Sequence, residues 1–208
     1  MERKWRRDIN SWINKGIYGL VPIYHKDGGN YTKLIFESDP PILVEKRVQT
    51  VVVRFAAFFQ KDIRLIRQQA REITGQRSMN PLPITLDIIL VPFKMRKPIG
   101  KDDGAVGYIL SNAIEKVVQA RDEVRVLLKN GQYCSVLDTY LTAQHHIGYA
   151  HQIYYHLLQE SSTGNFNTYG LCRECAQVYN HPITKGDVVA LSRNIEELVA
   201  KLDRLQKR

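Results

Sequence analysis

The sequence predicts an α+β protein, built of antiparallel hairpins, a long basic amphipathic helix and further helices towards the C-terminus. Two glycine-containing turns, each flanked by strand-like runs, indicate the hairpins. Apolar residues that recur at helical spacing over residues 47–74 indicate the long helix. With 208 residues, of which 44% are hydrophobic, the chain is long enough to bury a core.

The N-terminal part of the sequence predicts a helix followed by a hairpin. Residues 1–14 form a basic head, which opens with four basic residues and one acid in MERKWRR. Four apolar residues of the head recur at helical spacing, namely Trp5, Ile9, Trp12 and Ile13. Strand-like runs at 18–24 and 31–36 flank a turn at 27–30, and residues 42–45 favour a short third strand.

Residues 47–74 predict one long helix, which Gly75 ends. Its apolar face carries Val51, Phe55, Phe58, Phe59, Ile63, Ile66, Ala70 and Ile73. Its opposite face carries Arg47, Arg54, Lys61, Arg64, Arg67 and Arg71. The only acids in the segment are Asp62 and Glu72, so the positive charge is hardly balanced. Such a face suits a polyanion, and the alternative is a basic helix that only faces solvent.

The middle of the sequence predicts strands separated by loops. Prolines and glycines indicate loops at 76–83 and 92–104. Between them, the branched apolar run at 84–91 predicts a buried strand. A strand at 106–110 and a turn or short helix at 114–118 follow.

The last part of the sequence predicts a second hairpin and two helices. Asn130-Gly131 between two strand-like runs indicates a tight turn in which both residues have positive φ. Residues 141–159 predict a helix with Thr139 or Asp138 as its N-cap. Residues 161–186 predict a linker. Residues 187–208 predict an amphipathic helix with a heptad seam of Val188, Leu191, Ile195, Leu198, Leu202 and Leu205.

The charge and the composition bound the function. A formal charge of +9 concerns the partner rather than the fold, and nucleic acid is the commonest partner of so basic a chain. No apolar run approaches the roughly 18 residues of a membrane-spanning helix, so no membrane partner is expected. The N-terminus lacks an apolar secretion signal, and three cysteines form no even disulfide framework. We therefore expect a cytoplasmic location, at the nucleoid.

Motifs for catalysis are missing from the sequence. It contains neither a Gly-rich phosphate loop nor a GxSxG motif, so we expect no enzyme and no cofactor. Cys172 and Cys175 form a CxxC motif, and His181 follows six residues later. A strong zinc signal needs a second CxxC or an HxxxH pair, and the sequence has neither. A small zinc or redox protein is therefore an alternative, with these three residues as the metal candidates.

Seven pieces of the sequence follow one another in a recognisable order. They are KGIYGLVPIY (15–24), TKLIFES (32–38), the basic aromatic block (53–75), PITLDIILVP (83–92), GYILSNAI (107–114), the Asn130-Gly131 hairpin and QIYYHLL (152–158). In this order the chain resembles the family of the competence transcription factor ComK of Gram-positive bacteria. It departs from the family pattern at Val53-Arg54-Phe55-Ala56-Ala57, which lacks a Cys and a Gly, and at Tyr108, where a Trp is typical. The CRECAQ stretch and the heptad helix also differ from the family's C-terminal region.

The resemblance implies a DNA-binding domain at residues 15–160 and a function as a transcriptional activator. It implies recognition of A/T-rich boxes in double-stranded DNA, largely through the minor groove, by a homo-oligomer. Arginines and lysines would contact phosphates, and one or two arginines would enter the narrow groove of an A-tract. The expected DNA-binding residues are Arg54, Lys61, Arg64, Arg67 and Arg71, followed by Arg6, Arg7, Arg96 and Lys97. A second alternative is a protein–protein interaction module that uses the helix at 187–208.

Overall fold

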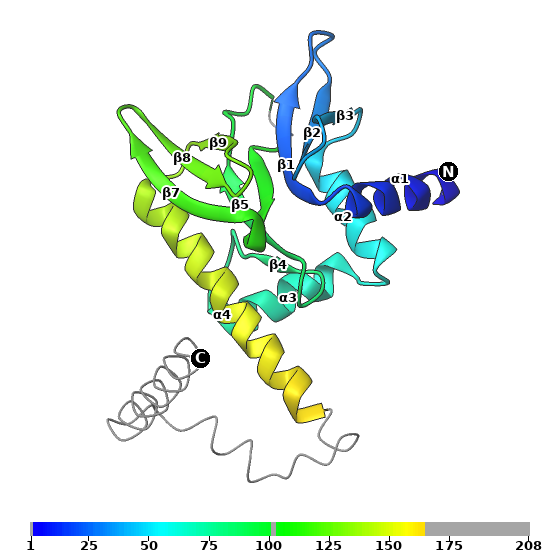
Figure 1. Ribbon diagram of the computed structural model, residues 1–208, viewed down its shortest axis with the longest axis vertical. Helices are drawn as coiled ribbons and strands as arrows, with labels where there is room; N and C mark the ends of the chain where they lie inside the picture. Colours follow the sequence, from blue (N-terminus) through cyan, green and yellow to red (C-terminus); the bar gives the residue numbers. More distant parts are fainter. Residues whose placement is uncertain (1, 101–102, 165–208) are drawn as a thin grey trace, which may run out of the picture. The chain divides into compact units, whose positions relative to one another are not determined.

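The computed structural model describes residues 2–100 and 103–164, which form the helices and antiparallel strands shown in Figure 1. Of the predicted linker at 161–186, only residues 161–164 are described. The predicted heptad helix and the residues Cys172, Cys175 and His181 lie outside the described residues. The elements are α1 (Glu2–Asn14), β1 (Ile17–Tyr24), β2 (Asn30–Phe36), β3 (Ile42–Val44), α2 (Val48–Phe58), α3 (Ile63–Thr74), β4 (Leu82–Pro83), β5 (Ile89–Lys94), β6 (Val106–Leu110), the 3-10 turn η1 (Ser111–Ala113), β7 (Ile114–Ala120), β8 (Glu123–Leu128), β9 (Tyr133–Val136) and α4 (Tyr140–Gly164). The predicted α+β class is confirmed.

The strands form two antiparallel sheets. Six strands lie in the order β3-β2-β1-β6-β5-β4, and three lie in the order β7-β8-β9. Side chains of successive residues point to opposite faces of a strand, so the larger sheet can pack on both sides. Leu34 and Tyr108 belong to a core that includes residues of α1, α2 and α3. Ile35 and Ile109, their neighbours in sequence, belong to a second core with the smaller sheet and α4.

Figure 1 shows the consequence of this two-sided packing. Helices α1 and α2 lie beside β1–β3. The smaller sheet and α4 lie on the other side of β5 from these two helices. The predicted N-terminal helix is confirmed as α1, because Ile9 and Trp12 are buried and Trp5 packs edge-on against Trp12. No helix in the described part of the chain has the length and apolarity needed to span a membrane.

Both predicted hairpins are present, but the turn at Asn130-Gly131 differs from the prediction. Only Gly131 has a positive φ, of 80°, and its N–H donates to the carbonyl of Leu128 at 2.9 Å. This is a three-residue loop in which glycine takes the left-handed position. The Asn130 amide instead donates to the carbonyls of Phe36 and Glu37, at 3.0 and 3.1 Å. The asparagine therefore ties the tip of the hairpin to the end of β2.

Two elements in the middle of the chain correct the prediction. The apolar run expected as a strand at 84–91 starts with a tight turn, in which the hydroxyl of Thr85 accepts a hydrogen bond from the Ile88 N–H at 3.1 Å. The strand β5 begins only at Ile89 and continues through Pro92. Residues 114–118, expected as a turn or short helix, belong to strand β7, which pairs with β8. Branched apolar residues occur both in the turn before Ile89 and in the strand after it, so residue composition alone did not distinguish the two.

The expected continuous helix at 47–74 is two helices, and this is the main correction to the predicted fold. Helix α2 ends at Phe58, and Gln60 takes the left-handed conformation with φ 59°. The Lys61 N–H donates to Ala56 O, which closes the helix end in the Schellman pattern. Asp62 then caps α3, because its carboxylate accepts the Arg64 N–H at 2.7 Å.

The predicted C-terminus of α3 and the predicted N-cap of α4 are confirmed, whereas α4 continues to Gly164, past the predicted end at residue 159 and into the predicted linker. Gly75 follows α3 with φ 70°, and its N–H donates to Arg71 O. Thr139 caps α4, because its hydroxyl accepts the Thr142 N–H at 3.2 Å. Asp138, the other candidate, instead accepts the Lys94 N–H at 2.7 Å, which joins the end of β5 to the start of α4.

Candidate nucleic-acid interface

The break at Gln60 divides the basic residues that the sequence placed on one helical face. On α3, Arg64 and Arg71 are exposed and Arg67 is half-buried at the edge of the packed face. On α2, Arg54 is half-buried near α1. The basic residues of the two helices therefore do not share one continuous helical face.

Arg64 has an acidic partner within its own helix turn. Its guanidinium Nη2 lies 3.1 Å from Oδ2 of Asp62. This contact, with the backbone hydrogen bond, holds the pKa of the Asp62 carboxyl below its usual value. The Arg64 side chain is 86% exposed, so it remains accessible to an anion, but Asp62 offsets part of its charge.

Arg67 is held where α2, α3 and β6 meet. Its Nη2 donates to Oε1 of Gln49 at 3.1 Å. Its guanidinium also lies against Tyr108, which is only 6% exposed. Burial raises the pKa of the Tyr108 hydroxyl, and the nearby Arg67 charge opposes that rise. Arg67 is thus fixed by two neighbours that the sequence pattern did not indicate.

Three arginines line one hollow of about 280 Å³, which we name the arginine hollow. Arg67 and Arg71 come from α3, and Arg77 comes from the loop that follows it. None of the described residues that line this hollow is acidic. The structure therefore brings together two of the predicted DNA-binding residues and adds Arg77, which the sequence analysis did not select.

A second hollow, of about 380 Å³, adjoins the first because both are lined by Gln49 and Val106. We name it the Arg96 hollow, and its lining includes Arg47, Arg96 and Asp103. The Asp103 carboxylate accepts hydrogen bonds from Tyr24, Asn30 and the Gly100 N–H, which hold its pKa well below the usual value.

Arg96 is a predicted DNA-binding residue that the fold also uses. Its guanidinium carbon lies 3.9 Å from the centre of the Tyr24 ring. Its Nε donates to Gly104 O at 2.8 Å, and Nη2 donates to Asn30. The remaining Nη1 is buried without a hydrogen-bond partner among the described residues. Arg96 therefore anchors the loop after β5 and forms part of the wall of the hollow.

The remaining predicted residues lie elsewhere. Arg6 and Arg54 line a third hollow, of about 280 Å³, between α1 and α2. Arg7, Lys61 and Lys97 are exposed. Of the nine predicted residues, the structure brings Arg67 and Arg71 into one hollow and places Arg96 in the adjoining one.

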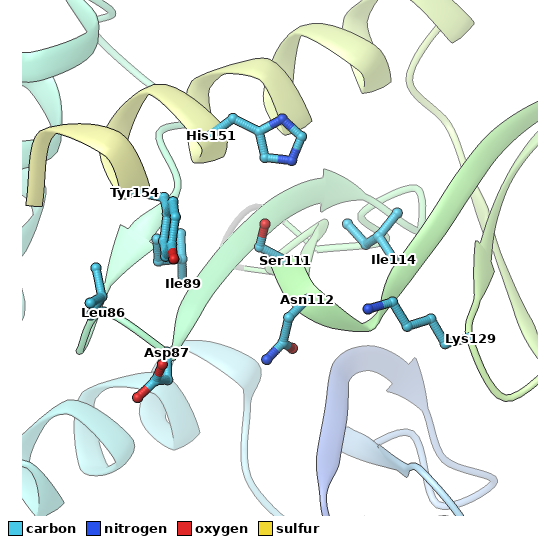
Figure 2. A pocket seen from close by; sticks show the side chains of 9 residues that line it. All are labelled: Leu86, Asp87, Ile89, Ser111, Asn112, Ile114, Lys129, His151 and Tyr154. Atoms are coloured by element: carbon cyan, nitrogen blue, oxygen red, sulfur yellow. The ribbon is translucent and has the colours of Figure 1, made fainter. Parts of the chain in front are cut away.

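A larger hollow, of about 400 Å³, lies between α4 and the turn after β6 and has a different chemistry. Figure 2 shows His151 and Tyr154 reaching into it from α4, opposite Ser111 and Asn112. Asp87 and Lys129 also line it, so its charges are of both signs. This hollow therefore does not favour a polyanion.

The described residues hold no cluster of three His, Cys, Asp or Glu side chains with which a metal could be bound. Cys134, on β9, is 7% exposed, and burial raises the pKa of its thiol to about 11. A thiol of this kind is protonated near neutral pH and is a poor metal ligand. The CxxC motif lies outside the described residues.

Comparisons with protein-family models, with curated proteins and with solved structures found no significant match to this chain.

Proposed function

We propose that the protein is a DNA-binding transcriptional regulator, and that the arginine hollow and the adjoining Arg96 hollow form the centre of its DNA-binding surface. The observation that carries the proposal is the gathering of Arg67, Arg71 and Arg77 around one hollow without an acid. Guanidinium groups bind phosphate oxygens in a planar, two-point geometry, which makes arginine suited to the DNA backbone. The formal charge of +9 favours the approach of DNA.

The finer part of the proposal comes from the resemblance to the ComK family. It specifies an activator that works as a homo-oligomer on A/T-rich boxes, in the cytoplasm at the nucleoid. The narrow minor groove of such DNA is strongly negative and attracts arginine side chains. Arg64 and Arg71 are exposed and lie seven residues apart on α3, so both side chains are available for contact with DNA.

Fluorescence anisotropy with a labelled A/T-rich duplex tests this function. The double variant R64E/R71E reverses two exposed charges of α3 and should weaken binding by more than about tenfold. For about four phosphate contacts, the wild-type affinity should fall by roughly 100-fold between 50 and 200 mM salt.

The matched control is Arg121→Glu, which reverses an exposed arginine at the turn between β7 and β8. It should change the affinity far less than R64E/R71E. Circular dichroism and thermal unfolding check that each variant is folded. Equal affinities of the wild type and a folded R64E/R71E would show that α3 does not contact DNA.

A further inference from the structure

The arginine hollow holds more positive charge than its surroundings neutralise. The structure gives Arg71 and Arg77 no ion pair with any described residue. The nearest acid in sequence, Glu72, accepts a hydrogen bond from Gln68 at 3.0 Å and does not line the hollow. Like charges that share a site repel one another, and a bound anion relieves that repulsion. The charge arrangement therefore favours an anion at this place.

The fold also positions Arg67 and the backbone of the loop that carries Arg77. Arg67 is held by Gln49 and Tyr108. Arg77 lies in a loop that Asn80 fixes, since its side chain accepts the Thr74 hydroxyl at 2.7 Å and donates to Gln76 O at 2.8 Å. A binding site in which one side chain and one loop are already held in place loses less entropy when its ligand arrives.

We propose that the arginine hollow is a phosphate-binding pocket, and that it seats one backbone phosphate of the bound DNA. The DNA part of this inference rests on the proposed function. A phosphate offers several oxygens in different directions, so three guanidinium groups from two elements can share it. A planar carboxylate is matched by a single bidentate arginine.

The adjoining Arg96 hollow defines the path of the DNA strand beyond the pocket. Gln49 and Val106 line both hollows, so a strand that leaves the pocket over these residues meets Arg47 and Arg96. The pocket then fixes the position of the strand, because one phosphate is held more tightly than its neighbours. Contacts with phosphates set the register of a protein on DNA without reading sequence.

The first experiment uses inorganic phosphate and no DNA. Phosphate binding to the full chain is followed by 31P NMR at constant ionic strength, with chloride as the replacing anion. The variant R71Q/R77Q should bind phosphate at least about tenfold more weakly than the wild type. Arg121→Gln, at the turn between β7 and β8 and outside the hollow, should bind it like the wild type. Absence of phosphate-specific binding in the wild type, or equal binding by R71Q/R77Q, would overturn the pocket.

The second experiment locates the phosphate on the DNA. A series of duplexes carries one neutral methylphosphonate linkage at successive positions. For the wild type, one position should cost about tenfold in affinity, while its neighbours cost less. In R71Q/R77Q that position should cost no more than its neighbours, because the pocket has already lost its charges.

The outcomes separate the pocket from the proposed function. If the wild type binds DNA but all positions cost the same, the DNA is held by diffuse charge and the seated phosphate is wrong. If the costly position persists in R71Q/R77Q, the phosphate lies elsewhere on the protein. If the wild type binds no duplex, the proposed function and the DNA as the source of the phosphate both fall, and the 31P experiment decides the pocket by itself.

Discussion

His146 on α4 lies in the core with neither ring nitrogen bonded to another described group. It is 6% exposed, and its ring lies edge-on to Phe93 at 6.1 Å between ring centres. Burial lowers its pKa below the ordinary value of 6.5, with the Asp138 charge opposing and the His145 and Lys94 charges adding to the shift. Burial in the folded state therefore favours the neutral form of this histidine.

The lowered pKa makes stability depend on pH. As pH falls below 6.5, the unfolded chain protonates His146 before the folded chain does, so the free energy of unfolding should decrease. Urea unfolding at pH 7.5 and 5.5 measures this loss. His146→Phe should lose less stability than the wild type between the two pH values.

His151→Gln is the control, because His151 is exposed on the same helix and is not among the groups that shift the pKa of His146. It should keep the pH dependence of the wild type. The same pH dependence in His146→Phe as in the wild type would assign the effect to other groups.

Residues on a periodic element were easier to select than residues in loops. Arg67 and Arg71 belong to a helical repeat, so the sequence indicated them. Arg77 follows the helix in a loop without periodicity, and only the contacts of Asn80 place it at the hollow. Gln49 and Tyr108 come from α2 and β6, and no local pattern shows that they meet Arg67.

At the scale of elements, the break between α2 and α3 decides where the basic residues lie. One of its signals was readable, because Asp62 is a favourable N-cap residue. The other was not, because a glutamine in the left-handed conformation has no sequence signature. The apolar residues on both sides kept a helical repeat, so the periodicity continued across a change of chain direction.

The strain at Gln60 predicts that a glycine there stabilises the protein. A residue with a side chain pays for positive φ, whereas glycine does not. Gln60→Gly should raise the free energy of unfolding by about 0.5–1 kcal/mol in urea unfolding.

Gln68→Gly gives the opposite control, because Gln68 lies exposed within α3. It should lower the free energy of unfolding by about 1 kcal/mol. A loss of stability in Gln60→Gly would mean that the glutamine side chain makes a contact that outweighs the backbone strain.

At the scale of the whole molecule, the alternation along the strands of the larger sheet explains why it packs on both sides. The sequence indicated most of its strands, because their apolar and turn residues lie close together in the chain. It did not indicate the order β3-β2-β1-β6-β5-β4, which brings β1 beside β6 across more than eighty residues. Such pairings depend on long-range packing, which local patterns do not record.

The proposed recognition of A/T-rich boxes makes a prediction about the whole protein on DNA. It should bind an A/T-rich duplex at least about tenfold more tightly than a G/C-rich duplex of equal length at moderate salt. A ligand of the A/T minor groove should displace it in a mobility-shift assay. Equal affinity for both duplexes would indicate general electrostatic binding, and the sequence-specific part of the proposal would be withdrawn.

The buried thiol of Cys134 can report on local opening of the smaller sheet. With a pKa of about 11 and 7% exposure, it should react with an alkylating reagent only when the strands around it separate. In a C172S/C175S background this thiol is the single target, and mass spectrometry follows its labelling over time. Labelling as fast as that of the urea-unfolded chain would contradict the burial. Slow labelling, compared with global unfolding in urea, would measure how often β9 opens in a molecule that is otherwise native.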